Sequence, residues 1–132
     1  MVAEASLADH FDGAIASIAQ AGAGGIIVPS SPLTNSQPVR LAEAARKHRL
    51  PSLFANSANV QAGGLMSYGA DFDDMYRTAA SYIDKILKGA HPADLPVDQA
   101  SRYEMTINMK TATILGLAIP VAVMARATVL FE

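Results

Sequence analysis

Short β-branched runs alternate with helical apolar stripes along the first half of the chain, and this alternation constrains the fold more than any other feature. Apolar residues recur at helical spacing from Ser6 to Gly22, and the run Ile26-Ile27-Val28 follows. A second helical stripe begins at Pro38, and a second short run covers 52–55. Parallel neighbours cannot be joined by tight turns and need crossover connections. The order helix, strand, helix, strand therefore predicts an α/β fold, a three-layer sandwich on a parallel sheet.

The remaining strands are predicted from glycine brackets and from alternation. The run at 26–28 is apolar throughout, which is typical of a central strand buried on both faces. Residues 63–69 form a compact run between glycines, and 103–109 alternate in polarity, so both are predicted strands. The last apolar run, 129–131, is either a closing strand or a frayed end. The whole chain, 1–132, is predicted to form a single α/β unit.

Several residues are predicted to begin helices. Pro38 suits a first helical position, Asp71 suits the N-cap of an amphipathic helix that extends to Gly89, and Asn108 suits the N-cap of a short helix. The acids that follow Asp71 lie in the positive first turn of that helix. Between these last two helices, residues 91–96 are too rich in proline for regular structure and are predicted to be a link.

Length, charge and cysteine content exclude several classes of protein. A chain of 132 residues with 51% hydrophobic residues can bury the core of one domain. Ten basic and twelve acidic residues give a net charge of −2, so no nucleic-acid partner is expected. The absence of cysteine removes disulfides and thiolate catalysis. Residues 1–12 lack the basic flank of a signal peptide, and the uncharged stretch 111–125, which Pro120 breaks, is too short for a membrane helix.

No reactive constellation is evident, so we expect no enzyme, no cofactor and no metal. The glycines at 22–25 follow a helix, which is the reverse of the order in a dinucleotide-binding turn. Ser67 lacks the glycine that a nucleophile elbow needs two residues earlier, because that position is Leu65. A small serine hydrolase that uses Ser67 is therefore the last alternative. The three histidines, His10, His48 and His91, lie in separate segments without the spacing of a metal site.

The candidate ligand-binding residues are polar side chains that follow the predicted strands. In an open parallel sheet, ligands gather at the carboxyl ends of the strands. Hydroxyl and amide groups there suit binding better than turnover, and an aromatic side chain can add a wall. The candidates are Ser30 and Ser31 after the first strand, Asn56 and Ser57 after the second, and Ser67 and Tyr68 at the end of the third.

Four collinear stretches, 62–69, 82–97, 103–112 and 115–120, resemble the ABC transporter substrate-binding protein family. They include Ala62-Gly63-Gly64-Leu65-Met66 and Leu87-Lys88-Gly89-Ala90-His91-Pro92. The resemblance implies a periplasmic protein with a type I periplasmic-binding-protein fold, of which this chain is the C-terminal portion. By that resemblance, 1–67 and 97–132 belong to the second lobe, and 68–96 form a helix and a linker that return toward the first lobe.

The resemblance also implies a function. Family members bind a small polar solute between two lobes and deliver it to an ABC permease, and amino acids, aromatic ones included, are candidate solutes. The six candidate residues would face that cleft, with no chemistry performed. Where relatives often carry aromatic residues, this chain has Ser31-Pro32-Leu33-Thr34-Asn35, and Ala58-Asn59 replaces a bulkier stretch.

A rival interpretation is a self-associating small α/β protein. A missing lobe would leave apolar surface on the helix that carries Met75, Ile83 and Ile86 and on residues 114–123. A homodimer could cover that surface.

Overall fold

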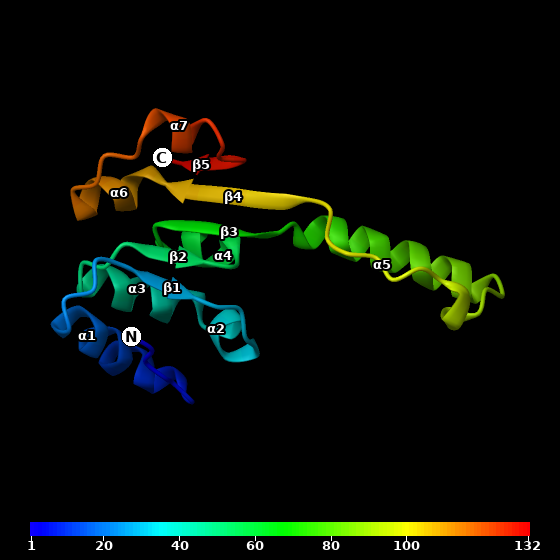
Figure 1. Ribbon diagram of the computed structural model, residues 1–132, viewed down its shortest axis with the longest axis horizontal. Helices are drawn as coiled ribbons and strands as arrows, with labels where there is room; N and C mark the ends of the chain where they lie inside the picture. The colour runs from blue at the N-terminus through cyan, green and yellow to red at the C-terminus, as the bar shows by residue number, and fades with distance from the viewer. The chain divides into compact units, whose positions relative to one another are not determined.

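The structure, a computed structural model, describes all residues from 1 to 132 and contains one five-stranded sheet. The strands lie side by side in chain order (Figure 1), which confirms the predicted α/β class. No helix combines the length and the hydropathy that a bilayer crossing requires. The strands are β1 (Ile26–Val28), β2 (Ser52–Phe54), β3 (Met66–Ala70), β4 (Tyr103–Asn108) and β5 (Val129–Phe131).

The sheet is mostly parallel, with one antiparallel pair. β1, β2 and β3 run in the same direction, and β4 and β5 are parallel to each other. Between β3 and β4 the direction reverses. The amide of Asn108, at the end of β4, donates to the carbonyl of Leu65 before β3 at 2.8 Å, and the amide of Asp71 after β3 donates to Arg102 before β4 at 3.0 Å. The run 129–131 is thus a closing strand, which settles the alternative that the sequence leaves open.

The prediction that the run at 26–28 is a central strand is wrong. β1 is the terminal strand of the sheet, and the Ile27 side chain is 77% exposed. Only the face that carries Ile26 and Val28 is covered, by α1 and α3. An apolar run indicates that a strand is hydrophobic, but it does not indicate whether the strand has a neighbouring strand on both sides or on one side only.

The helices begin where capping residues allow. Pro38 is the first residue of α3, the Asp71 side chain accepts from the Asp74 amide at 3.1 Å, and the Asn108 side chain accepts from the Thr111 amide at 2.9 Å, which confirms three predicted helix starts. The elements are η1 (Ala8–His10), α1 (Phe11–Gln20), α2 (Pro32–Ser36), α3 (Pro38–Lys47), α4 (Ser57–Gln61), α5 (Phe72–Leu87), η2 (Pro92–Asp94), α6 (Met109–Leu115) and α7 (Val121–Met124).

The core lies where α1 and α3 pack on β1 and β2. Full burial of each large apolar side chain contributes about 1.5 to 3 kcal/mol. Alanines on the buried face of α3 have no side chain beyond Cβ, so this helix packs closely on its neighbours. The buried members of the core are Phe11, Ile15, Ile26, Leu41, Ala44, Ala45, Leu50 and Phe54.

The chain divides into two compact units. The first unit, Met1–Gly69 with Glu104–Glu132, holds the core and all six candidate ligand-binding residues. The second unit, Ala70–Tyr103, holds α5, which has no buried residue. Within the second unit, the Tyr82 hydroxyl donates to the Pro96 carbonyl at 2.8 Å and so ties α5 to the returning segment.

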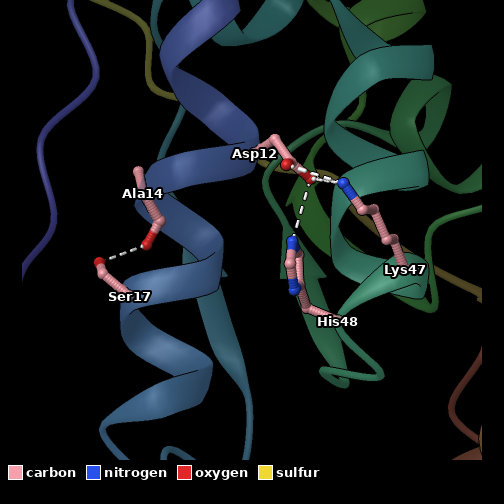
Figure 2. A network of polar contacts seen from close by, with 5 residues as sticks. All are labelled: Asp12, Ala14, Ser17, Lys47 and His48. Carbon is pink, nitrogen blue, oxygen red and sulfur yellow. Dashed lines mark hydrogen bonds and ion pairs between the residues drawn. The ribbon is translucent and has the colours of Figure 1, made fainter.

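A polar network pins α1 to α3 on the surface of the first unit (Figure 2). Asp12 of α1 accepts from the Lys47 ammonium at 2.8 Å and lies 3.0 Å from the ring of His48, the residue that ends α3. The hydrogen bond from Lys47, followed by that from His48, lowers the pKa of Asp12 below its ordinary value of 3.8. His48 is therefore a helix-end histidine, and no group of acids and histidines able to hold a metal surrounds it.

The Asp12 network predicts a pH-dependent stability difference. The folded pKa of Asp12 lies below the unfolded one, so the contribution is present above pH 3.8 and disappears as the pH falls through the folded value. We expect Asp12→Asn to melt at a lower temperature than the parent chain near neutral pH, and the two melting curves to converge in acid. Asp98→Asn, which removes a carboxylate from the second unit, is the control. A difference in melting temperature that stayed constant across pH would contradict this assignment.

Gly69 lies so close to the backbone of a neighbouring segment that there is no room for a side chain. A Cβ at this position would collide with the carbonyl oxygen of Ala55, the residue that follows β2. We expect Gly69→Ala to lower the free energy of unfolding by about 1 to 3 kcal/mol in urea titrations. In the matched control Gly24→Ala, the added Cβ meets nothing within 4 Å, so that variant should be neutral or slightly stabilised. Equal effects of the two changes would show that the contact does not matter.

Candidate ligand-binding site

The loops after β1 and β2 lie at one edge of the sheet. Ile26, Ile27 and Val28 pair in parallel with Ser52, Leu53 and Phe54, so both strands end level with each other. Ser30 and Ser31 follow β1, and Asn56 and Ser57 follow β2. The structure therefore places these four sequence-predicted residues at the same carboxyl edge, where open α/β sheets bind ligands.

Ser31 has a structural task at this edge. Its hydroxyl accepts from the Thr34 amide at 3.1 Å, and its own amide donates to the Thr34 hydroxyl at 2.8 Å. This reciprocal capping box begins α2, a five-residue helix between β1 and α3. The same Thr34 hydroxyl is also 3.0 Å from the Pro29 carbonyl, so the turn after β1 is tied to α2.

Ser30 is exposed and has one side-chain neighbour. The Asn35 amide nitrogen donates to the Ser30 hydroxyl at 3.0 Å. Asn35 is itself exposed, and its amide lies at this edge of the sheet. The sequence analysis missed Asn35 because it considered only residues close to the ends of strands. The serine-to-threonine spacing of the capping box is the signal that would have found α2, and with it the return of Asn35 toward Ser30.

Asn56 caps α4 with the oxygen of its side-chain amide and not with the nitrogen. The oxygen accepts from the Ala58 amide at 2.9 Å, which leaves the two hydrogens of the nitrogen for another acceptor. Ser57 is the first residue of α4, and both side chains are half-buried. Asn56 therefore combines a fixed orientation with unused donors, a combination that suits recognition of a solute oxygen.

Ser67 and Tyr68 have opposite environments. Ser67 pairs in register with Phe54 inside β3, and only 2% of its surface is exposed. Tyr68 points to the other face of the sheet and is 51% exposed. The strand continues to Ala70, so Ser67 lies inside it and does not present its hydroxyl at the edge.

Asn59, one turn into α4, is the chain's unpaired buried polar side chain. It is 3% exposed, and its amide nitrogen has no hydrogen-bond partner. A buried donor without an acceptor carries the full cost of desolvation, roughly 1 to 3 kcal/mol. Sequence alone gives no signal for this, because an asparagine near a helix N-terminus is usually a cap or a surface residue.

The exposed part of this edge offers neutral hydrogen-bonding groups. Ser30, Asn35 and Ser57 supply hydroxyl and amide atoms, and Asn56 adds two amide hydrogens. None of these groups is a base, a thiolate or a carboxylate, so the arrangement suits reversible recognition of a small polar molecule.

Comparison with known proteins agrees with this fold. The family model described as ABC transporter substrate binding protein matches residues 2–130. A conserved domain protein from Vibrio cholerae superposes with a TM-score of 0.86 at 29% sequence identity, over 96% of this chain and 42% of that one. An ABC domain in complex with L-Trp from Streptococcus pneumoniae has a TM-score of 0.86 at 27% identity, over 96% and 43% of the two chains.

A third structure shows the fold alone. The ligand-free, open form of a substrate binding protein with adhesive properties from Clostridium difficile has a TM-score of 0.67 at 20% identity, over 97% of this chain and 42% of that one. No match was found among proteins of curated function. The chain thus spans well under half of the length of the structures it resembles. Because the family model covers nearly every residue, the chain belongs to the ABC transporter substrate binding protein family.

Proposed function

We propose that this chain is part of the solute-binding component of an ABC importer and holds a small polar solute at the carboxyl ends of β1 and β2. The observation that carries the proposal is the convergence of Ser30, Asn56 and Ser57 on one edge of a sheet in a member of this family. Family membership supports two further parts of this proposal: an ABC permease is the partner of the complete protein, and that protein works outside the cytoplasm, in the periplasm.

We infer that the solute is an amino acid or a molecule of similar size and polarity. The edge offers amide hydrogens for a carboxylate oxygen, hydroxyl oxygens for an ammonium group, and the half-exposed ring of Tyr68 for an apolar side chain. The pneumococcal neighbour, whose structure contains L-Trp, supports a solute of this class. Ser31 and Ser67 belong to the scaffold of this site, because one caps α2 and the other is buried.

The proposed activity is binding without chemistry. A serine nucleophile needs a base within hydrogen-bonding distance and access to its substrate. Ser67 lacks access because it is buried, and the Asp12–His48 pair belongs to α1 and the end of α3. These positions favour binding over the serine hydrolase that the sequence left as its last alternative.

This chain supplies one side of the proposed cleft. Enclosed sites bury roughly 70 to 90% of a ligand, and the edges of β1 and β2 can cover only one side of it. The relatives are more than twice as long as this chain, and we propose that the remainder of such a protein supplies the opposite side. The 132-residue chain alone should therefore bind its solute weakly.

The solute site can be tested by NMR titration with L-tryptophan, L-leucine and L-glutamate. We expect saturable shifts at Ser30, Asn56 and Ser57 with millimolar dissociation constants, about −4 kcal/mol of binding free energy. The sharpest variant is Asn56→Asp. It keeps the oxygen that caps α4 but replaces the amide donors with a negative charge, so it should weaken binding of a carboxylate solute about tenfold without lowering the melting temperature.

Ser31→Ala is the matched control for this titration. It breaks the capping box and should cost about 0.5 to 2 kcal/mol of stability while the solute shifts at Asn56 persist. Submicromolar binding by the 132-residue chain would contradict our proposal that this chain supplies only one side of the cleft. Absence of shifts at the strand ends with all three amino acids would contradict the site itself.

A homodimer is the second candidate, and α5 favours it. Phe72, Tyr76, Ile83 and Leu87 form an exposed apolar stripe along this helix, and Leu87 is 81% exposed. In our proposal the rest of the longer protein covers this stripe, whereas in the alternative a second copy covers it.

Light scattering during size-exclusion chromatography shows whether a second copy of the chain covers the apolar stripe of α5. We expect a monomer at micromolar concentration, because isolated interfaces much smaller than about 1,000 Å² rarely hold a stable dimer. A dimer that Tyr76→Lys converts to monomer, while Arg77→Lys on the charged face does not, would favour the homodimer instead.

A further inference from the structure

The two short helices at the proposed solute site, α2 and α4, begin alike but with one difference. Each has five residues, follows a strand, and carries a polar N-cap residue and a polar residue three positions later. In α2 the later residue is Thr34, whose hydroxyl accepts from the Ser31 amide at 2.8 Å. In α4 the later residue is Asn59, whose side-chain nitrogen has no hydrogen-bond partner. The capping pattern is therefore complete in α2 and incomplete in α4.

The unused amide of Asn59 belongs to the same helix turn as Asn56. The backbone amide of Asn59 donates to the Asn56 carbonyl at 3.2 Å, and side chains at these two positions of a helix start are neighbours. Each Cα–Cβ bond of a helix tilts toward its N-terminus, so the Asn59 side chain leans toward the edge where Asn56 and Ser57 lie. Asn56 caps α4 with its oxygen and keeps both amide hydrogens. Two carboxamides with unused donors thus adjoin at this edge.

Burial gives the Asn59 donor an advantage in binding. Only 3% of this residue is exposed, although most buried polar atoms in proteins have a hydrogen-bond partner. The cost of removing water from the amide is therefore present before any solute arrives, and an acceptor that reaches the nitrogen gains a hydrogen bond without displacing water from it. Turning the amide toward the edge breaks no bond of this nitrogen, because it has none.

We propose that Asn59 is a solute-binding residue, and that its side-chain nitrogen and that of Asn56 together hold the carboxylate of the solute. This assignment rests on the proposed function, which places the solute at the ends of β1 and β2. The donors are the two side-chain amides, and the backbone groups of the short helix α4 have no part in it.

A carboxylate is the chemical group that fits this pair of donors. It is an acceptor only, and its two oxygens can each take one amide hydrogen. A hydrogen bond to an ionised acceptor is also stronger than one to a neutral acceptor. An ammonium group has no acceptor and cannot use either nitrogen. The pair therefore selects the carboxylate end of an amino acid and leaves its ammonium group to the hydroxyls of the edge.

The first measurement follows the side-chain amide signals of Asn56 and Asn59 by NMR in the parent chain. The probes are L-leucine and L-leucinamide, which in mildly acidic buffer share an ammonium group and a side chain and differ in the carboxylate. We expect both signals to shift saturably with L-leucine at millimolar dissociation constants. L-leucinamide should bind about tenfold more weakly, because it has one neutral acceptor in place of two charged oxygens.

Asn59→Leu separates binding from packing. It keeps the branched shape of the side chain but removes the donor and the buried amide. We expect its melting temperature to rise by about 2 to 8 °C and its affinity for L-leucine to fall about tenfold. A residue that only packed would change stability without changing affinity.

Thr34→Val, at the equivalent position of α2, is the matched control. It removes a hydroxyl that is already hydrogen-bonded, so it should lower the melting temperature. Its affinity for L-leucine should stay within about twofold of that of the parent chain, because Thr34 contributes no donor to the carboxylate. The two variants should therefore change stability in opposite directions, and only Asn59→Leu should weaken binding.

Two results would overturn the proposal and leave the solute site intact: equal affinity of Asn59→Leu and the parent chain for L-leucine, or an unshifted Asn59 signal while Ser30 and Asn56 respond. No response at any strand end would contradict the proposed function, and this assignment with it. Should Asn59→Leu fail to fold, the comparison of L-leucine with L-leucinamide at the Asn59 signal of the parent chain decides.

Discussion

The parallel register between β1 and β2 decides where everything else in the first unit lies. Because Val28 and Phe54 are paired, both strands end level, and the two following loops meet at one edge. The same register places Ile26 and Phe54 on one face, where α1 and α3 cover them. A slip of one residue would turn the apolar side chains to the opposite face, so packing of the core and placement of the loops are a single constraint.

The hydroxyls and amides at this edge serve two purposes that compete. Serine and asparagine after a strand often begin helices. Both the hydroxyl and the backbone amide of Ser31 are hydrogen-bonded to Thr34 at the start of α2. Asn56 uses only its side-chain oxygen, which accepts from the Ala58 amide. The difference lies in side-chain chemistry, since a carboxamide separates its acceptor from its donors while a hydroxyl carries both on one atom. Asn56 is thus fixed by the fold and keeps its amide hydrogens for the solute that we propose.

Sequence reasoning succeeded where local rules decide the outcome. The helix starts at Pro38, Asp71 and Asn108 depend on residues next to them in the chain, and each was predictable. The strand ends that carry Ser30 and Asn56 were predictable for the same reason.

Sequence reasoning failed where a distant neighbour decides. The exposure of Ile27 depends on whether a strand lies beyond β1, and the collision that a side chain at Gly69 would make depends on the Ala55 carbonyl in another strand. Ser67 is buried while Tyr68, the next residue, is 51% exposed, so the covering of each face of β3 decides, and the neighbouring sequence does not specify that covering.

The two uncovered surfaces of the chain, the outer edge of β1 and the apolar stripe of α5, are uncovered in different physical senses. Natural edge strands are protected by charged side chains, by proline or by bulges, and β1 carries none of these within Ile26–Val28. Its deficit is one of hydrogen bonds. The deficit of α5 is one of apolar burial, since a helix with no buried residue exposes Tyr76, Ile83 and Leu87. Backbone hydrogen-bonding groups would correct the first deficit and apolar side chains the second, so the two surfaces call for partners of different chemistry.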